Sequence, residues 1–300
     1  MKNSLLFLGC NHDQIPYLNF IKKKLDWKIV GVDLDKKAPG KFLCDKFYNV
    51  GYDDLKGLVK IGKIEKFTKH DMVFTAAAQF AQKGAAHFSA HFGIKYPSEK
   101  SIDLCLDKTK YYDYFFKNKI PIPKTWKIKN EDDIKDKIKL SNSKYFYLKS
   151  DFSKNPNYVY RFNKSNIPWH NFFWGKDRFL RKYYVLQEEV KGTSLRINIY
   201  GQRFNVFEFS NGKKTLNYHK DIYDIKIIQT LKKLMIKQGI QNWLVKFDII
   251  LSKKKYVVLD IGIDPPSRML KNSRKNKIDF VKYYLTQYLD GKVEYPQILD

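Results

Sequence analysis

Short apolar runs alternate with amphipathic stretches over the first hundred residues of the chain. The runs of strand length are residues 4–10, 27–35 and 71–78, and a further short strand is predicted within 38–50. Between them, residues 14–25 and 52–64 place apolar side chains at the spacing of a helix that is buried on one face. Strands that alternate with helices predict a parallel sheet covered by helices. We therefore expect an α/β domain over residues 1–100.

The pattern changes near residue 100. One helix is predicted from Ser98 to Pro121 and Pro123, since these prolines impose extended chain after it. Beyond it, helices are mixed with strands that are joined by short turns, which is typical of an α+β region. Strands are predicted within 145–150, 158–162 and 183–209, and a hairpin at 245–263. Helices are predicted at 130–140, 222–240 and 277–290, and Gly239 is expected to end the second of them as a C-cap. We expect a second domain at 101–300, with a smaller part at 101–185 and a larger part at 186–300.

The predicted hairpin contains acidic residues. Asp248 lies in the apolar run VKFDII, Asp260 lies in YVVLDIGI, and Asp264 follows. A carboxylate inside an apolar strand is costly unless it is paired, hydrogen-bonded or bound to a metal, and its oxygens suit a hard cation such as Mg²⁺. Arg268 can bind a phosphate or a carboxylate through two hydrogen bonds. The alternative is that both strand aspartates face solvent.

The charge of the chain raises the question of nucleic acid. Lys and Arg number 57 against 31 Asp and Glu, giving a net charge of +26, but only seven of the 57 are arginine. The lysines are dispersed along the chain, whereas recognition surfaces favour clustered arginine. A basic surface steers any anion, including ATP. We therefore expect an anionic small molecule as ligand and regard nucleic acid as unlikely.

Several other classes of protein are disfavoured. No apolar run reaches eighteen residues, so we expect no membrane span. The apolar part of the start is only LLFLGC and lacks a cleavage site, which argues against a signal peptide. The three cysteines have no metal-ligand spacing and are expected to be reduced thiols. His87 and His91 share a helix face, but no acidic pattern of a zinc protease accompanies them. We expect a cytoplasmic protein.

The order of these pieces resembles the ATP-grasp superfamily over nearly the whole chain. LFLGCNHDQIPYLNF, VGVDLDKKAPG and YPSEKSIDLCLDKTKYYDYFFKNKIPIP are similar to the small α/β domain, and the segment after it, of biotin carboxylase and the carboxyaminoimidazole ribonucleotide synthases. VLQEEVKGTSLRINIYGQRFNVFEF resembles the amino-acid ligase branch. The resemblance implies an N-terminal parallel α/β domain followed by a two-subdomain ATP-grasp fold. It also implies an ATP-dependent carboxylate–amine ligase that uses Mg²⁺, with Mn²⁺ as an alternative.

The resemblance also implies roles for individual residues. It assigns contacts with the nucleotide to Lys108, Lys149, Lys154, Gln187, Glu188, Glu189, Val190 and Ser194. It makes Asp248, Asp260 and Asp264 the metal ligands, and it gives Arg196 and Arg268 catalytic roles near the transferred phosphate. The expected substrates are a small-molecule or peptide carboxylate and an amine, and a homodimer is favoured on base rates.

The chain departs from the pattern of the family in four features. Both metal acids are aspartates, Gly262 replaces the expected asparagine, the loop SDFSKNPN after Lys149 has no glycine, and Ser194 stands where the family usually has an acid near the ribose. Two alternatives therefore stay open beside the ligase. One is a kinase or phosphotransferase on the same fold, and the other is a nucleotide-binding protein whose catalytic site has degenerated.

Overall fold

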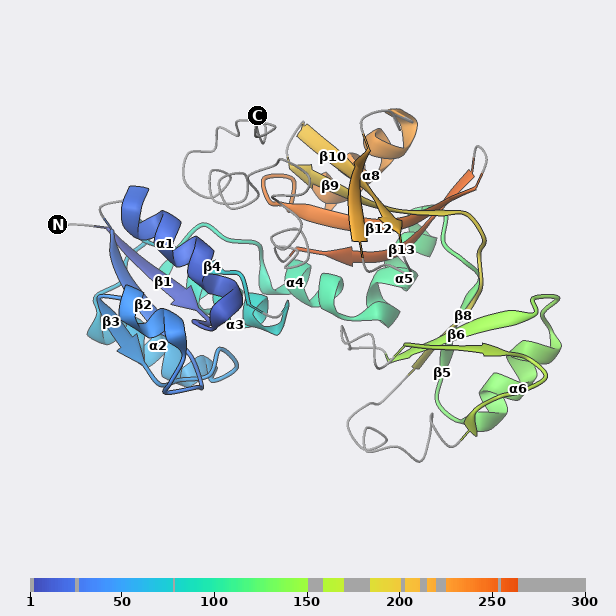
Figure 1. Cartoon of the computed structure of the whole chain (residues 1–300), viewed down its shortest axis with the longest axis horizontal. Helices are drawn as coiled ribbons and strands as arrows, with labels where there is room; N and C mark the ends of the chain where they lie inside the picture. Colours follow the sequence, from blue (N-terminus) through green and yellow to red (C-terminus); the bar gives the residue numbers. More distant parts are fainter. Residues whose placement is uncertain are drawn as a thin grey trace. The chain divides into compact units, whose positions relative to one another are not determined.

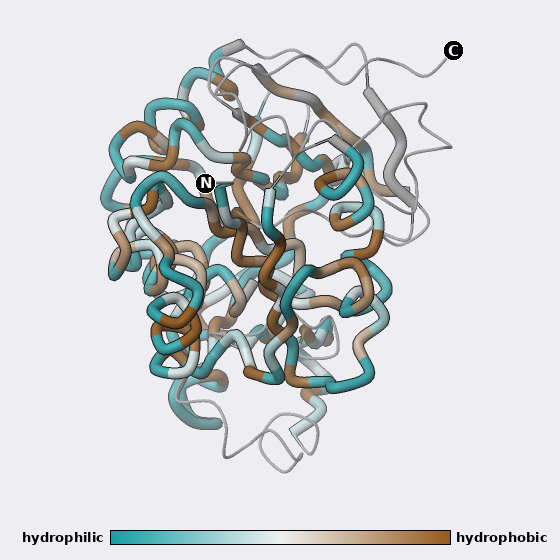
Figure 2. The backbone as a smooth tube through the Cα atoms, turned by 90° about the vertical axis from the view of Figure 1, so that its left-hand side faces the viewer, coloured by the Kyte–Doolittle hydropathy of each residue, from teal (hydrophilic) through white to brown (hydrophobic). Residues whose placement is uncertain are grey.

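The computed structural model describes residues 3–24, 27–77, 79–150, 159–169, 184–200, 203–210, 215–219, 225–252 and 255–263. The chain divides into two compact units, each built from segments that are separate in the sequence. The first comprises residues 1–103, 197–246 and 262–300, and the second comprises 104–196 and 247–261. Hydrophobic and hydrophilic stretches alternate along the backbone of the described residues (Figure 2).

The first unit contains the parallel sheet that the sequence predicts. Its strands are β1 (Ser4–Leu8), β2 (Lys28–Val32), β3 (Lys46–Tyr48) and β4 (Met72–Thr75), in the order β3-β2-β1-β4. Every pairing in this sheet is parallel. All five residues of β1 are buried, as expected for a central strand that is covered on both faces. The predicted α/β architecture is confirmed here.

Alternation along β1 divides the core of this sheet between its two faces. The helices of the layer are α1 (Ile15–Lys24), α2 (Leu55–Ile64) and α3 (Gln79–Phe92). Leu5 and Phe7 belong to the cluster that α1 enters, whereas Leu6 and Leu8 belong to the cluster with α2 and α3. Successive strand side chains point to opposite faces, so helices cover both faces of the sheet (Figure 1).

Segments from later in the sequence complete the first unit. They include β10 (Arg203–Ser210), β11 (Thr215–His219) and α8 (Ile225–Lys237). Phe207, Phe209 and Leu244 join the core cluster on the α1 face. After α8, Gly239 has φ +64°, as predicted for a C-cap, because glycine adopts the left-handed region without a Cβ clash.

A five-stranded sheet has the order β11-β10-β9-β12-β13. Its other strands are β9 (Thr193–Tyr200), β12 (Val245–Ser252) and β13 (Lys255–Gly262). Strands β12 and β13 follow one another directly in the sequence and are neighbours in the sheet. The hairpin predicted for the two aspartates is therefore present.

The second unit contains a four-stranded antiparallel sheet. Its strands are β5 (Thr125–Ile128), β6 (Tyr145–Ser150), β7 (Val159–Asn163) and β8 (Tyr184–Glu188), in the order β5-β8-β6-β7. Helix α6 (Glu131–Lys139) covers one face, where Ile134 and Ile138 pack against Phe146, Leu148 and Leu186. Successive strand residues point to opposite faces, so the face away from α6 carries the side chains that alternate with these core residues.

The single helix predicted from Ser98 to the prolines is wrong. The structure has two helices, α4 (Glu99–Leu106) and α5 (Lys108–Lys117). They are separated by Asp107, whose backbone is extended, with φ −98° and ψ 111°. Its carboxylate accepts hydrogen bonds from the backbone N–H groups of Thr109 and Lys110. An aspartate that caps a new helix in this way ends the preceding one.

No helix among the described residues is long and apolar enough to cross a bilayer. The linear boundaries at residues 100 and 185 remain predictions. Among the site residues predicted from the sequence, Lys154, Asp264 and Arg268 lie outside the described residues.

Candidate nucleotide site

The face of the antiparallel sheet opposite α6 carries polar side chains. Along β6, Phe146, Leu148 and Ser150 are buried, whereas Tyr147 and Lys149 alternate with them and are partly exposed. In the pairing of β6 with β8, Lys149 lies opposite Val185 and Tyr147 lies opposite Gln187. Directly opposite residues of an antiparallel pair share a face, so the sheet presents Lys149 and Gln187 together.

A hydrogen-bonded chain fixes these two side chains. The Nζ of Lys149 donates to the Oε1 of Gln187 at 2.6 Å, and the Nε2 of Gln187 donates to the Oγ1 of Thr125 at 3.0 Å. Lys149 also lies 3.4 Å from the hydroxyl of Tyr112 on α5. Gln187 is only 1% exposed, and its amide is satisfied on both sides, as a buried polar group requires. The network holds the ammonium in one position.

Two neighbouring tyrosines of α5 extend this network to β13. The hydroxyl of Tyr111 donates to the Oδ1 of Asp260 at 3.1 Å, and the hydroxyl of Tyr112 donates to the carbonyl of Leu259 at 2.6 Å. Burial, followed by the nearby charge of Asp260, raises the pKa of both tyrosines above the usual range. Both tyrosines therefore stay neutral donors, and they join Lys149 to the strand that carries Asp260.

Sequence reasoning did not single out these tyrosines. Both are buried in α5, and a buried tyrosine needs a partner for its hydroxyl. The adjacent Tyr111–Tyr112 pair in an otherwise amphipathic helix was the available signal. Local sequence patterns could not identify the partners, because they lie about 150 residues further along the chain.

Lys108 occupies the first position of α5 and is buried, with 6% of its surface exposed. The capping carboxylate of Asp107 directly precedes it and is bonded to Thr109 and Lys110. Asp107, the first residue of the Asp-Lys pair, therefore has a structural role, because it caps the start of α5. A buried lysine must be paired or must serve a ligand, and the prediction that Lys108 contacts the nucleotide is untested.

The two glutamates after Gln187 make separate contacts. Glu188 accepts a hydrogen bond from Ser141 at 2.6 Å. Glu189 is held by Arg161 through Nε–Oε1 at 2.7 Å and Nη2–Oε2 at 3.2 Å. The hydrogen bonds from Arg161 lower the pKa of Glu189. These contacts fix the end of β8, after which Val190 follows.

Arg196 of β9 and Asp248 of β12 form a bidentate pair. The Nε of Arg196 lies 2.7 Å from Oδ1, and Nη2 lies 2.9 Å from Oδ2. Nearby along β9, the hydroxyl of Ser194 is buried without a hydrogen-bond partner among the described residues. The residue predicted to act near the transferred phosphate therefore contacts a predicted metal ligand directly.

The donor chemistry of Asp248 and Asp260 fits a hard cation. Both are carboxylates on neighbouring strands, and Mg²⁺ favours such oxygens. The described residues contain no cluster of three or more metal-ligating side chains. A complete protein ligand set would therefore need a donor from outside these residues, such as Asp264, or ligand oxygens from a bound nucleotide.

No protein-family model and no curated protein matches the chain by sequence. Solved structures match its fold. N5-carboxyaminoimidazole synthetase from Staphylococcus aureus, solved with ADP, superposes with a TM-score of 0.75 at 13% identity, over 100% of this chain and 81% of that one. The solved structures that match this chain have the ATP-grasp fold.

The chain has the ATP-grasp fold.

Two further ATP-grasp structures are similar over nearly the whole chain. Biotin carboxylase from Campylobacter jejuni, solved as a β,γ-ATP complex, gives a TM-score of 0.74 at 13% identity, over 99% of this chain and 72% of that one. L-amino acid ligase from Bacillus licheniformis gives 0.72 at 12% identity, over 98% and 78%. The ATP-grasp fold that the resemblance implied and the fold class predicted from the sequence are confirmed.

Proposed function

We propose that this ATP-grasp chain is an ATP-dependent carboxylate–amine ligase. It joins an acid to an amine through an acyl-phosphate and releases ADP and phosphate. The main support is the convergence on helix α5, where Tyr112 contacts Lys149 and Tyr111 contacts Asp260. The resemblance to the ATP-grasp superfamily implies that Lys149 contacts the nucleotide and that Asp260 binds the metal. One rigid helix thus links the group proposed for the phosphates with the group proposed for the cation.

The proposed reaction brings together groups that are all anionic. A carboxylate attacks the γ-phosphate and displaces ADP, and the amine then displaces phosphate from the acyl-phosphate. Positioning and charge neutralisation dominate such a phosphoryl transfer. Lys149, held by Gln187, orients the nucleotide, while Lys108 and Arg196 neutralise charge on its phosphates. Asp248 and Asp260 would hold Mg²⁺, which supplies further neutralisation of the phosphate oxygens.

The proposal extends to ligands and to the setting of the protein. Its substrates are a small-molecule or peptide carboxylate and an amine, its nucleotide is ATP, and Mn²⁺ is an alternative to Mg²⁺. The net charge of +26 favours anionic substrates through electrostatic steering. We infer a cytoplasmic location, and a homodimer is the assembly that base rates favour.

One observation supports a second candidate, a nucleotide-binding protein without turnover. Both carboxylate oxygens of Asp248 are bonded to Arg196, so a cation must compete with a guanidinium for this ligand. A site held in this state would bind the nucleotide but would bind the metal ion needed for phosphoryl transfer only weakly. A kinase is the remaining alternative, and it differs from a ligase in needing only one acceptor.

ADP release separates these possibilities. The wild type is incubated with Mg-ATP and a panel of acids and amines, singly and in pairs, beside Lys149→Ala. A ligase releases ADP steadily only when an acid and an amine are both present, and Lys149→Ala abolishes this release. Steady release with a single acceptor would indicate a kinase. Nucleotide binding without release for any pair would favour the binding protein.

A further inference from the structure

A cavity of about 260 Å³ lies between helix α5 and strands β5 and β8 of the second unit. It opens on the same sheet face as Lys149, but toward β5, the edge strand on the far side of β8. Drug-sized ligands and cofactors occupy pockets of about 300–1,000 Å³. The volume is below this range, so the cavity suits a ligand smaller than a nucleotide.

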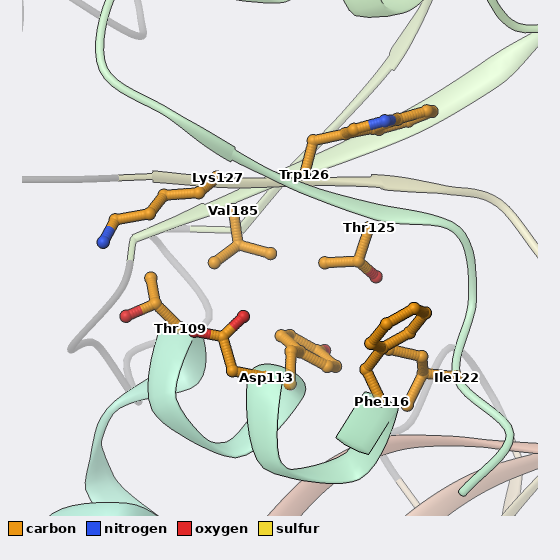
Figure 3. Close-up of a pocket in the computed structure, with 9 residues that line it drawn as sticks. Thr109, Asp113, Phe116, Ile122, Thr125, Trp126, Lys127 and Val185 are labelled. Atoms are coloured by element: carbon orange, nitrogen blue, oxygen red, sulfur yellow. The ribbon is translucent and has the colours of Figure 1, made fainter. Parts of the chain in front are cut away.

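The two ends of the cavity differ in chemistry (Figure 3). At one end, Asp113 and Thr109 project from α5 and Lys127 projects from β5, which combines a negative charge, a positive charge and a hydroxyl. At the other end lie Phe116 and Ile122, and Val185 lines the sheet side between the ends. Trp126, although it borders the cavity, points away from it in Figure 3.

This arrangement selects for a particular class of ligand. A ligand that carries both an ammonium and a carboxylate can engage Asp113 and Lys127 at once, and charge-assisted hydrogen bonds are stronger than neutral ones. The apolar end favours a hydrophobic side chain on the same ligand. The side chain of Phe116 is otherwise largely exposed, at 76%, so a ligand that covers it removes apolar surface from water.

We propose that this cavity binds a small zwitterionic α-amino acid with an apolar side chain. The ammonium binds Asp113, the carboxylate binds Lys127, and the side chain packs against Phe116 and Ile122. The proposal concerns a site that neither the sequence resemblance nor the proposed reaction assigns, and it does not rest on the proposed function.

Two walls of the cavity belong to the network of the candidate nucleotide site. Tyr112 lines the cavity and contacts Lys149, and Thr125 lines it and accepts the hydrogen bond from Gln187. An amino acid in the cavity therefore contacts the residues that position Lys149. Binding of the amino acid in the cavity and of the nucleotide at its site is therefore coupled. Each ligand changes the binding free energy of the other by the same amount.

The test uses L-leucine as the probe, titrated by calorimetry into the full chain without nucleotide, so that a failure of the proposed ligase activity does not affect it. We expect saturable binding with a Kd of about 1 mM or tighter. N-acetyl-L-leucine, which lacks the ammonium, and L-leucinamide, which lacks the carboxylate, should each bind at least about tenfold more weakly. Glycine should also bind more weakly, because it leaves Phe116 uncovered.

Variants assign the binding to this cavity. Asp113 and Lys127 are exposed, so Asp113→Asn and Lys127→Met should fold normally, and each should weaken L-leucine binding about tenfold or more. Asp136→Asn and Lys129→Met, at exposed positions outside the cavity, are the matched controls and should bind as the wild type does. Absence of saturable binding, or equal binding by the cavity and control variants, would overturn the proposal.

Discussion

The guanidinium of Arg196 holds both carboxylate oxygens of Asp248. The two contacts measure 2.7 Å and 2.9 Å, and the side chains are only 13% and 15% exposed. This fork-to-fork geometry fixes the orientation of both groups. Because the family resemblance implies that Arg196 acts near the transferred phosphate and that Asp248 binds the metal, the pair links the two halves of the proposed chemistry.

Breaking this pair should destabilise the fold. Asp248→Asn removes the anion and leaves a mostly buried guanidinium without its charged partner, at a cost of about 2 kcal/mol in the free energy of unfolding. Urea denaturation followed by circular dichroism measures the difference. Arg196→Met and the double variant complete a double-mutant cycle. A coupling energy near zero would show that the pair contributes nothing to stability.

The hydrogen bond from Tyr111 to Asp260 should also be measurable. Tyr111→Phe removes a buried donor to a carboxylate, and we expect a loss of about 1–2 kcal/mol of stability. Tyr114 of the same helix is the matched control, because its buried hydroxyl has no hydrogen-bond partner among the described residues. Tyr114→Phe should be neutral or slightly stabilising. Equal effects of the two substitutions in thermal denaturation would contradict the assigned role of Tyr111.

The ion pair between Glu189 and Arg161 should make stability depend on pH. The hydrogen bonds from Arg161 lower the pKa of Glu189 in the folded state. The stability that the ion pair adds is therefore fully present above a pH of about 4.3, the pKa of an unfolded glutamate. It is lost as the pH falls through the lower pKa that Glu189 has in the folded protein. Arg161 is 47% exposed, so the effect is small and screened by salt.

Denaturation of the wild type and Glu189→Gln at a series of pH values tests this dependence. The wild type should be the more stable above about pH 5, and the difference should shrink toward pH 3. Asp136→Asn, at an exposed position of α6, serves as the control. A difference that does not change with pH would show that Glu189 contributes through packing and not through its charge.

The thiols of Cys10 and Cys44 should differ in reactivity. A hydrogen bond from Cys10 lowers the pKa of Cys44, whereas the same pairing and burial raise the pKa of Cys10. The thiolate is the nucleophile, and Cys44 is also the more exposed of the two. Iodoacetamide should alkylate Cys44 first, as mass spectrometry of peptides can show. Faster labelling of Cys10 in the folded protein would contradict this order.

The sequence predicted those features of the fold that depend on local patterns. Continuous apolar runs identified the central parallel strands, and Gly239 was correctly predicted to end α8, because these features need only neighbouring residues. The same reasoning missed the break at Asp107. There the apolar spacing continues through the cap, and the choice between one helix and two depends on the side-chain bonds to Thr109 and Lys110.

The candidate site was predicted in its residue types but not in its connections. Lys149, Gln187 and Asp260 were recognised because their chemistry fits ATP-grasp motifs. Periodicity could not show that Tyr111 and Tyr112 bridge β6 and β13, or that Arg196 occupies both oxygens of Asp248. These contacts join residues separated by 37 to 149 positions, and only the folded chain brings them together.

Calorimetric titration of Mg-ATP into the wild type and Asp260→Asn tests the central claim most directly. Retained secondary structure of the variant by circular dichroism is the control for folding, and Lys149→Ala tests the other end of the network. We predict binding by the wild type that requires Mg²⁺ and that weakens at least about tenfold in each variant. Unchanged affinity for Mg-ATP in both variants would contradict the proposed nucleotide site.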